Sequence, residues 1–211
     1  MSTDDLIARL AFNAGPAKRL FIGRDMAPVL LLGMILCSAI SLGVRGLVPE
    51  VMWTGAALWT KLTYALALAA TSAWLLHILA FPGKRGLWVY RLMVLVGLYM
   101  ATAGMISVLN VPVGERLSYV MGKYALICPW AIPLLSLPTM FGLLHLTKRF
   151  APTDLRWTGF AAGLLAGSIA AAGYALSCKE EAIGFVAVWY SLGILFSAGI
   201  GAAAGPRLLR W

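Results

Sequence analysis

The chain has 211 residues, of which 61% are hydrophobic and 12% are charged, and its formal net charge is +9. A soluble single domain needs a larger charged fraction to cover its surface, so the composition excludes an ordinary globular domain. The basic excess needs no nucleic acid partner, because it follows from the topology derived below. The default partner of such a chain is the lipid bilayer, with its anionic lipids.

Six apolar stretches are each long enough to cross a hydrocarbon core of about 30 Å, which takes roughly 20 helical residues. They are continuous rather than alternating, which excludes transmembrane β-strands. We therefore predict an all-α polytopic membrane protein with an N-terminal segment (1–25), a six-helix membrane domain (26–204) and a short tail (205–211). The predicted spans are 26–44, 62–81, 92–109, 124–146, 157–176 and 183–204.

The basic residues fix the orientation, because cytoplasmic loops retain Lys and Arg. With the N-terminus inside, twelve of the 17 basic residues fall in inner segments and five in outer ones. We therefore predict that both termini are cytoplasmic. Aspartates in the first 25 residues argue against a cleaved signal peptide. The five outer basic residues are Arg45, Lys61, Arg116, Lys123 and Lys179.

Residues 2–12 are predicted to form a short helix, with Asp4 and Asp5 near its positive end and a Gly-Pro stop after it. So short a helix is marginal in water, so it should dock either on the lipid surface or in the groove of a cytoplasmic protein. The two aspartates disfavour anionic lipid. The candidate contacts for a protein partner are Asp4, Asp5, Leu6, Ile7 and Leu10.

Small residues recur at every fourth position in the fifth and sixth stretches. Such ridges let helix backbones approach closely, and packing within one chain is the favoured interpretation over a dimer interface. A similar stripe in the first stretch contains Cys37, which we interpret as a packing residue. The ridge residues are Gly159, Gly163 and Gly167 in the fifth stretch and Gly193, Ser197 and Gly201 in the sixth.

Cys128 begins the fourth predicted span and Cys178 ends the fifth. The 18 residues from Cys128 to Leu146 rise roughly 27 Å, and the 21 from Trp157 to Cys178 rise roughly 31 Å. Since a short inner loop joins these two helices, they should be antiparallel neighbours whose thiols lie at one height on the outer face. A disulfide also requires Cα atoms within about 7 Å, which spacing alone does not establish.

The surroundings of the two cysteines suggest reactive thiols. Pro129 suits the first turn of a helix, which places Cys128 where the helix dipole favours a thiolate. Lys179 would favour a thiolate at Cys178, against the two carboxylates that follow. Two thiolates beside carboxylates suit a soft or borderline divalent cation, although no histidine lies near to complete a structural zinc site. A structural disulfide, a redox- or metal-responsive switch and uninvolved thiols all stay open.

The sequence offers little to an enzyme. It has no phosphate-binding glycine loop, catalytic triad pattern or His-rich metal motif. His77 and His145 lie at comparable depths in the membrane, so they could hold a haem between them. The commoner role of a histidine near a helix end is a local hydrogen bond or contact with the interface. The rival functions are a membrane thiol oxidoreductase that passes electrons to quinone and a small-solute transporter. We predict neither, because there is one outer cysteine pair and no charged residue at the centre of a span.

Several motifs resemble the NrsF-like family, six-span anti-sigma factors of the proteobacterial inner membrane. They are Thr3-Asp4-Asp5-Leu6-Ile7, Cys128-Pro129, Tyr174-Ala175-Leu176, Trp189-Tyr190 and Gly205-Pro206-Arg207-Leu208-Leu209. The resemblance implies that the chain holds a sigma factor of the extracytoplasmic-function type at the inner membrane. It also implies release under stress, including heavy metals, with two periplasmic cysteines as sensors at the positions of Cys128 and Cys178.

The chain departs from that family pattern at the second cysteine. Relatives often have His-Cys-Pro there, whereas this chain has Ser177-Cys178-Lys179. Loss of the imidazole weakens a metal site of the family type and leaves thiol oxidation relatively stronger. No permanent cofactor is expected, and a transient heavy metal or divalent cation at Cys128 and Cys178 is the candidate ligand.

Overall fold

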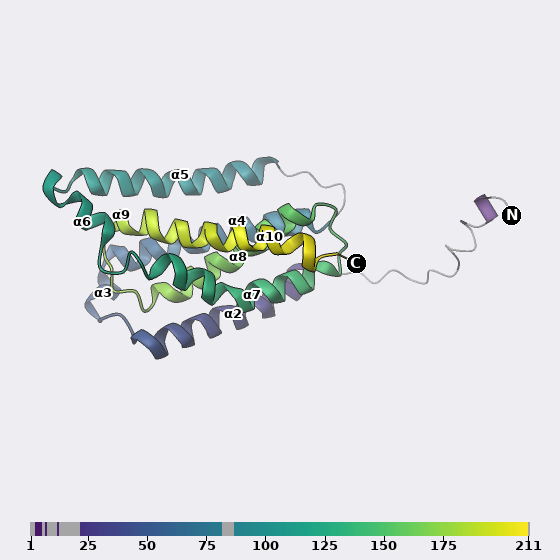
Figure 1. Cartoon of the computed structure of the whole chain (residues 1–211), viewed down its shortest axis with the longest axis horizontal. Coiled ribbons are helices and arrows are strands. Elements are labelled where there is room, and N and C mark those ends of the chain that lie inside the picture. The colour runs from purple at the N-terminus through teal and green to yellow at the C-terminus, as the bar shows by residue number, and fades with distance from the viewer. Residues whose placement is uncertain (1–2, 6, 8–11, 13–21, 82–86, 211) are drawn as a thin grey trace.

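The computed structural model describes residues 3–5, 7, 12, 22–81 and 87–210. Within these residues every regular element is a helix, and six helices are long and apolar enough to cross a membrane, which confirms the predicted fold class (Figure 1). The elements are α2 (Ile22–Arg45), α3 (Val51–Thr54), α4 (Ala56–Leu79), α5 (Leu87–Leu109), the 3₁₀-helix η1 (Val113–Glu115), α6 (Arg116–Met121), α7 (Cys128–Lys148), α8 (Leu155–Ala175), α9 (Ile183–Phe185), the π-helix η2 (Val186–Tyr190) and α10 (Ser191–Leu208).

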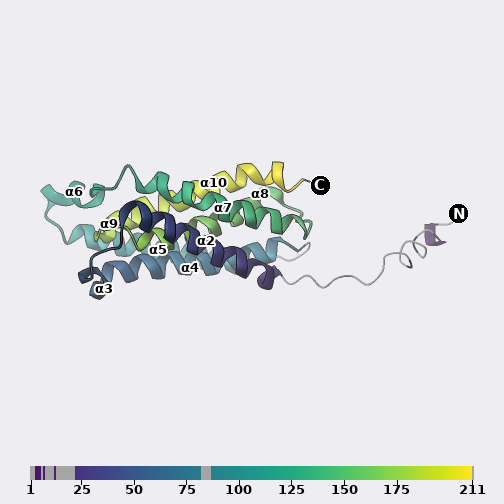
Figure 2. The ribbon, with the colours of Figure 1, turned by 90° about the horizontal axis from the view of Figure 1, so that it is seen from below.

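Helix α8 is the centre of the bundle. It packs against α2, α4, α7 and α10, and nearly every one of its residues is buried (Figures 1 and 2). A helix surrounded on all sides has to be apolar all round, and its glycines and alanines let four neighbours approach its backbone. The composition of this stretch therefore explains its central place.

The small-residue ridges of α8 and α10 face each other. A Cβ added at Gly163 would overlap the carbonyl oxygen of Ser197, and one added at Gly159 would overlap that of Gly201. The backbones thus touch along this contact, which we call the glycine seam. Gly193 lies elsewhere: a Cβ there would meet the Ile132 side chain of α7 at 3.0 Å. The seam lies within one chain.

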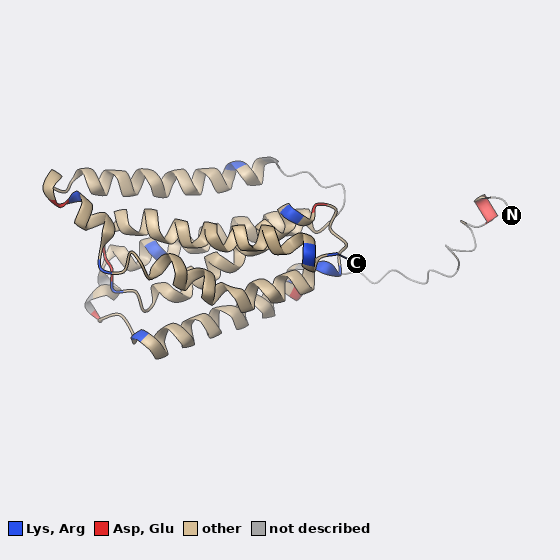
Figure 3. Cartoon of the chain, viewed as in Figure 1, with Lys and Arg blue, Asp and Glu red and all other residues tan. Residues whose placement is uncertain are grey.

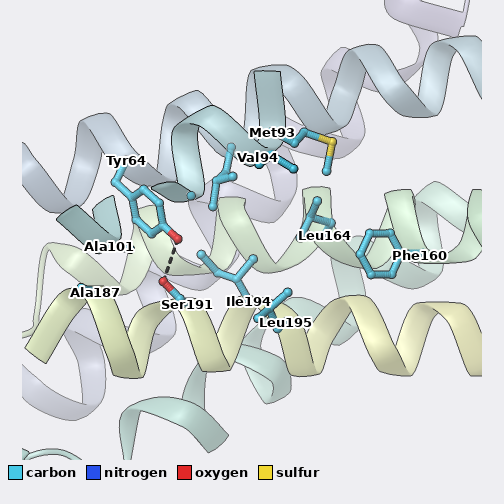
Figure 4. Close-up of a pocket in the computed structure, with 12 residues that line it drawn as sticks. Tyr64, Met93, Val94, Ala101, Phe160, Leu164, Ala187, Ser191, Ile194 and Leu195 are labelled. Atoms are coloured by element: carbon cyan, nitrogen blue, oxygen red, sulfur yellow. Dashed lines mark hydrogen bonds between the residues drawn. The ribbon is translucent and has the colours of Figure 1, made fainter. Parts of the chain in front are cut away.

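Helix α5 stands at the edge of the bundle and contacts α4, α9 and η2 (Figure 1). Between α5 and the faces of α4, α8 and α10 lies an apolar cavity of about 340 Å³ (Figure 4). The hydroxyls of Tyr64 and Ser191 face into it but are hydrogen-bonded to each other at 2.7 Å. The wall of the cavity is therefore largely apolar, and the hydrogen bond between the two hydroxyls satisfies both of them.

The charged residues of the described chain gather near the two ends of the bundle (Figure 3). We call the end that holds Cys128 and Cys178, beside α3, α6 and α9, the Cys end, and the opposite one the terminal end, because the C-terminus lies there (Figure 1). Of the predicted N-terminal contacts, Leu6 and Leu10 lie outside the described residues. Asp4, Asp5 and Ile7 are helical, and Ile7 is 59% exposed.

Candidate functional site: a buried thiol cluster

The fold brings Cys128 and Cys178 together at the Cys end. Cys128 is the first residue of α7, and Cys178 lies three residues beyond the end of α8. Both are free thiols and both are fully buried. The two thiols lie close enough together for each to shift the pKa of the other. Two segments 50 residues apart in the chain thus supply one pair of adjacent, unexposed thiols.

Tyr174 and Arg45 extend this pair toward a third helix. The hydroxyl of Tyr174, on α8, lies 3.4 Å from the Cys128 sulfur. Arg45 donates to the same hydroxyl at 2.6 Å, and its guanidinium stacks over the ring of Tyr124 at 4.5 Å. Because Arg45 is the last residue of α2, its charge also suits the negative end of that helix. One hydroxyl thereby ties α2, α7 and α8 at a single point.

Lys61 is the residue that sequence reasoning misplaced. We predicted it in an outer loop, but α4 begins at Ala56, so Lys61 lies inside this helix and is fully buried. Its ammonium donates to the carbonyl oxygen of Cys178 at 2.9 Å and to that of Glu180. The missed signal was helical spacing, since Lys61 shares a buried stripe with Leu58 and Tyr64.

The environment of Cys178 favours its thiolate. The hydrogen bond from Cys128 and then the positive charge of Lys61 lower the pKa of the Cys178 thiol to about 6, against the opposing effect of burial. We predicted Lys179 as the activating cation, but Lys179 is exposed and the buried Lys61 takes this part. Since the thiolate is the nucleophile and the metal ligand, Cys178 is the more reactive of the two by this criterion.

Tyr190 closes the cluster from the sixth helix. It is fully buried at the end of the π-helix η2, and its ring lies 6.1 Å from that of Tyr174. Its hydroxyl lies near Cys178 but outside hydrogen-bonding geometry. Single π-turns occur frequently at functional sites, where they re-aim a side chain. Here the π-turn directs a phenol at the thiols.

The donor set fits some metals better than others. Among the described residues no group of three or more His, Cys, Asp or Glu side chains could hold a metal ion. The carboxylate of Glu180 accepts instead from the backbone N–H of Lys123 at 3.1 Å. Two sulfurs alone suit a soft ion that accepts two thiolates, whereas a structural zinc site takes four ligands. The cluster is thus suited to thiol oxidation or to a soft metal.

Comparison with known proteins gives full-length matches. The family described as "Negative regulator of sigma F" (NrsF) matches residues 10–211. The "Probable anti-sigma-F factor NrsF" of Azospira oryzae is 34% identical over 220 residues, covering 100% of both chains. The "Anti-sigma-F factor NrsF" of Caulobacter vibrioides is 33% identical over 214 residues, again covering 100% of both. No solved structure matches the chain.

Proposed function

This chain belongs to the NrsF family of negative regulators of sigma F, and from that premise we propose that it is a membrane anti-sigma factor. It holds a sigma factor of the extracytoplasmic-function type at the cytoplasmic face of the inner membrane. It releases this partner when Cys128 and Cys178 react with a heavy metal or an oxidant. It acts as a regulator and not as an enzyme. The full-length match to two relatives named as anti-sigma-F factors supports the first part.

The topology supports the direction of signalling. The terminal end carries basic residues that the positive-inside rule assigns to the cytoplasm, including Lys148 and Arg149 at the end of α7 and Arg207 in the last turn of α10. The Cys end then faces the periplasm, where thiols meet oxidants and metals first. The thiol cluster is the input on this side, and the N-terminal segment, with Asp4, Asp5, Leu6, Ile7 and Leu10, is the output on the other.

Helix α2 is the proposed route from the cluster to the output. Arg45 is the last residue of α2 and contacts the Cys128 thiol through the hydroxyl of Tyr174. The first residue of α2, Ile22, lies within the last residues of the N-terminal segment. Oxidation of the two thiols to a disulfide removes two protons and two electrons, which pass to the oxidant. A soft metal ion instead displaces the protons and binds both sulfurs. Either reaction takes the Cys128 thiol away from Tyr174 and leaves Arg45 with a changed partner.

The energies are of the required size. Releasing a partner 100-fold needs about 2.7 kcal/mol of coupling between the two sites. A disulfide typically contributes about 2–4 kcal/mol, and a hydrogen bond to a charged group about 1.5–3 kcal/mol. One thiol reaction in this cluster is therefore sufficient to shift the bundle between two states of different affinity for the sigma factor.

The sensor is tested by a reporter gene for the sigma-dependent promoters in cells that carry Cys128→Ser and Cys178→Ser together. We expect the double variant to repress the reporter but to lose induction by cadmium ion or by diamide. Cys37→Ser is the matched control, because Cys37 is buried apart from the cluster and its thiol donates to the carbonyl of Leu135. Normal induction in the double variant would refute the sensor while leaving the anti-sigma function intact.

The docking segment is tested by a pull-down of the sigma factor from cells. Leu6→Asp with Leu10→Asp places charge on the predicted apolar stripe, so we expect binding to be lost. Ala8→Asp adds the same charge on the opposite side of the predicted helix and should leave binding unchanged. If all variants retain the sigma factor, the N-terminal segment is not its binding site.

A further inference from the structure

We propose that Lys61 is a positioning residue of the thiol pair: its buried ammonium holds the segment from Cys178 to Glu180 against α4, so that the Cys178 sulfur stays beside Cys128. This inference rests on the proposed sensor role of the two cysteines and adds the residue that makes them act as a pair. A lysine on one span thus fixes the distance between two thiols carried by other elements.

The first argument is the geometry of Cys178. This residue lies beyond the last residue of α8, so that helix holds its backbone N–H but leaves its carbonyl and the residues after it without a helical partner. Its backbone N–H donates to the carbonyl of Tyr174 at 3.1 Å, which secures one side of the segment. The carbonyls of Cys178 and Glu180 both point to the ammonium of Lys61, which secures the other.

The second argument is the burial of Lys61. A fully buried ammonium loses its hydration at a cost of several kcal/mol unless it is paired. It donates to the carbonyls of Cys178 and Glu180, and the negative charges of the Cys178 thiolate and of the Glu180 and Glu181 carboxylates compensate its positive charge. A lysine held in this way resists movement of the segment, because any displacement leaves a buried charge unpaired.

The third argument concerns the other charged and titratable groups around Cys178. Cys178 faces Cys128 of α7, Tyr190 of η2 and Tyr174 of α8. Arg45 of α2 interacts in turn with Tyr174. None of these donates to the carbonyls of the segment in the described structure, whereas Lys61 donates to two of them. Lys179 is next in sequence but exposed. Among these groups, the contacts to the carbonyls of Cys178 and Glu180 therefore belong to Lys61.

The test compares one-site and two-site alkylation in the full-length protein, purified in detergent, in a Cys37→Ser background. Dibromobimane bridges two neighbouring thiols, each of which loses its proton and displaces one bromide, whereas monobromobimane labels one. In Lys61→Met we expect the bridging rate to fall by about tenfold, as expected for loss of a charge-assisted hydrogen bond. Monobromobimane labelling of Cys178 also slows when Lys61 no longer lowers the pKa of that thiol, but it should slow less than bridging, so the ratio of the two rates is the readout. Lys61→Arg, which retains a buried donor, should keep bridging close to the parent rate.

Lys179→Met is the matched control, since it removes an exposed lysine from the same segment and should leave bridging unchanged. If Lys61→Met does not yield a monodisperse protein, Lys61→Gln is used in its place. The glutamine side chain is shorter than lysine and uncharged, so this variant should also lower the bridging rate. Undiminished bridging in either folded variant, or an equal loss in Lys179→Met, would overturn the inference. Neither result depends on a sigma factor, so failure here and failure of the reporter test are distinguishable.

Discussion

The glycine seam and the thiol cluster both involve the central helix α8, yet they hold their neighbours in opposite ways. Along the seam, Gly159 and Gly163 lie against the backbone of α10 with no side chain between them. In the cluster, Tyr174 and Cys178 meet α2, α4 and α7 through hydroxyl, sulfur and cationic groups. The seam has one close-packed arrangement, whereas the cluster can exchange its bonds. A bundle with a fixed axis and a chemically adjustable end is a structure suited to switching.

The largest effect is expected from a break in the seam. Gly163→Leu would force a side chain into the carbonyl of Ser197, so we expect a loss of stability of about 3 kcal/mol or more. Fluorescence-detected size exclusion should show aggregation or loss of the protein. Gly199→Leu is the control, because a Cβ at Gly199 meets nothing within 4 Å. Equal behaviour of the two variants would mean that α8 and α10 do not pack as described.

A smaller effect is expected in the cluster from Tyr174→Phe. This change keeps the ring but removes the hydroxyl that joins Cys128 to Arg45, so the protein should lose about 1–3 kcal/mol and remain folded. Thermal unfolding in detergent gives the stability, and the reporter should show an altered threshold for inducer. Tyr99→Phe, at a residue 70% exposed on α5, should change neither. An unaltered threshold in Tyr174→Phe would remove the hydroxyl from the signalling route.

The pH dependence of alkylation separates the two thiols. With the pKa of Cys178 at about 6, its thiolate predominates above that pH, so its rate with iodoacetamide should rise through pH 6 and level off by pH 7. Peptide mass spectrometry between pH 5 and 8 gives the rate at each cysteine. Cys128→Ala removes the donor to Cys178 and should shift this midpoint upward. A midpoint near the ordinary thiol value of about 8.5 in the parent protein would contradict the arrangement.

The smallest effect is expected at the third cysteine. Cys37→Ser keeps a donor for the carbonyl of Leu135, so stability should change by no more than about 1 kcal/mol. Induction of the reporter by metal or oxidant should match that of the parent. A lost response would mean that Cys37 is also needed for induction. The thiol cluster would then no longer differ from the packed part of the bundle in being the site of sensing.

Sequence reasoning found the cluster in part. Spacing placed Cys128 and Cys178 at one height, because the lengths of two antiparallel helices follow from residue counts. It did not find Lys61 or Arg45, which were assigned to outer loops by their charge. A lysine next to tryptophans and threonines indicates a membrane boundary, and only the partners of its ammonium reveal that it is buried. Tyr174 and Tyr190 were noticed in family motifs without a role, since their hydroxyls act across helices.

The sequence by itself determined the helical fold class and the family, since the six long apolar runs and the order of motifs are local properties of the chain. It also determined the small-residue ridges, since each lies on one helix. Only the tertiary structure decided which ridge meets which, and that a lysine from α4 and an arginine from α2 meet the thiols of α7 and the segment after α8. Hydrogen bonds between distant segments depend on how the helices rotate and pack, and that information lies in no single stretch of sequence.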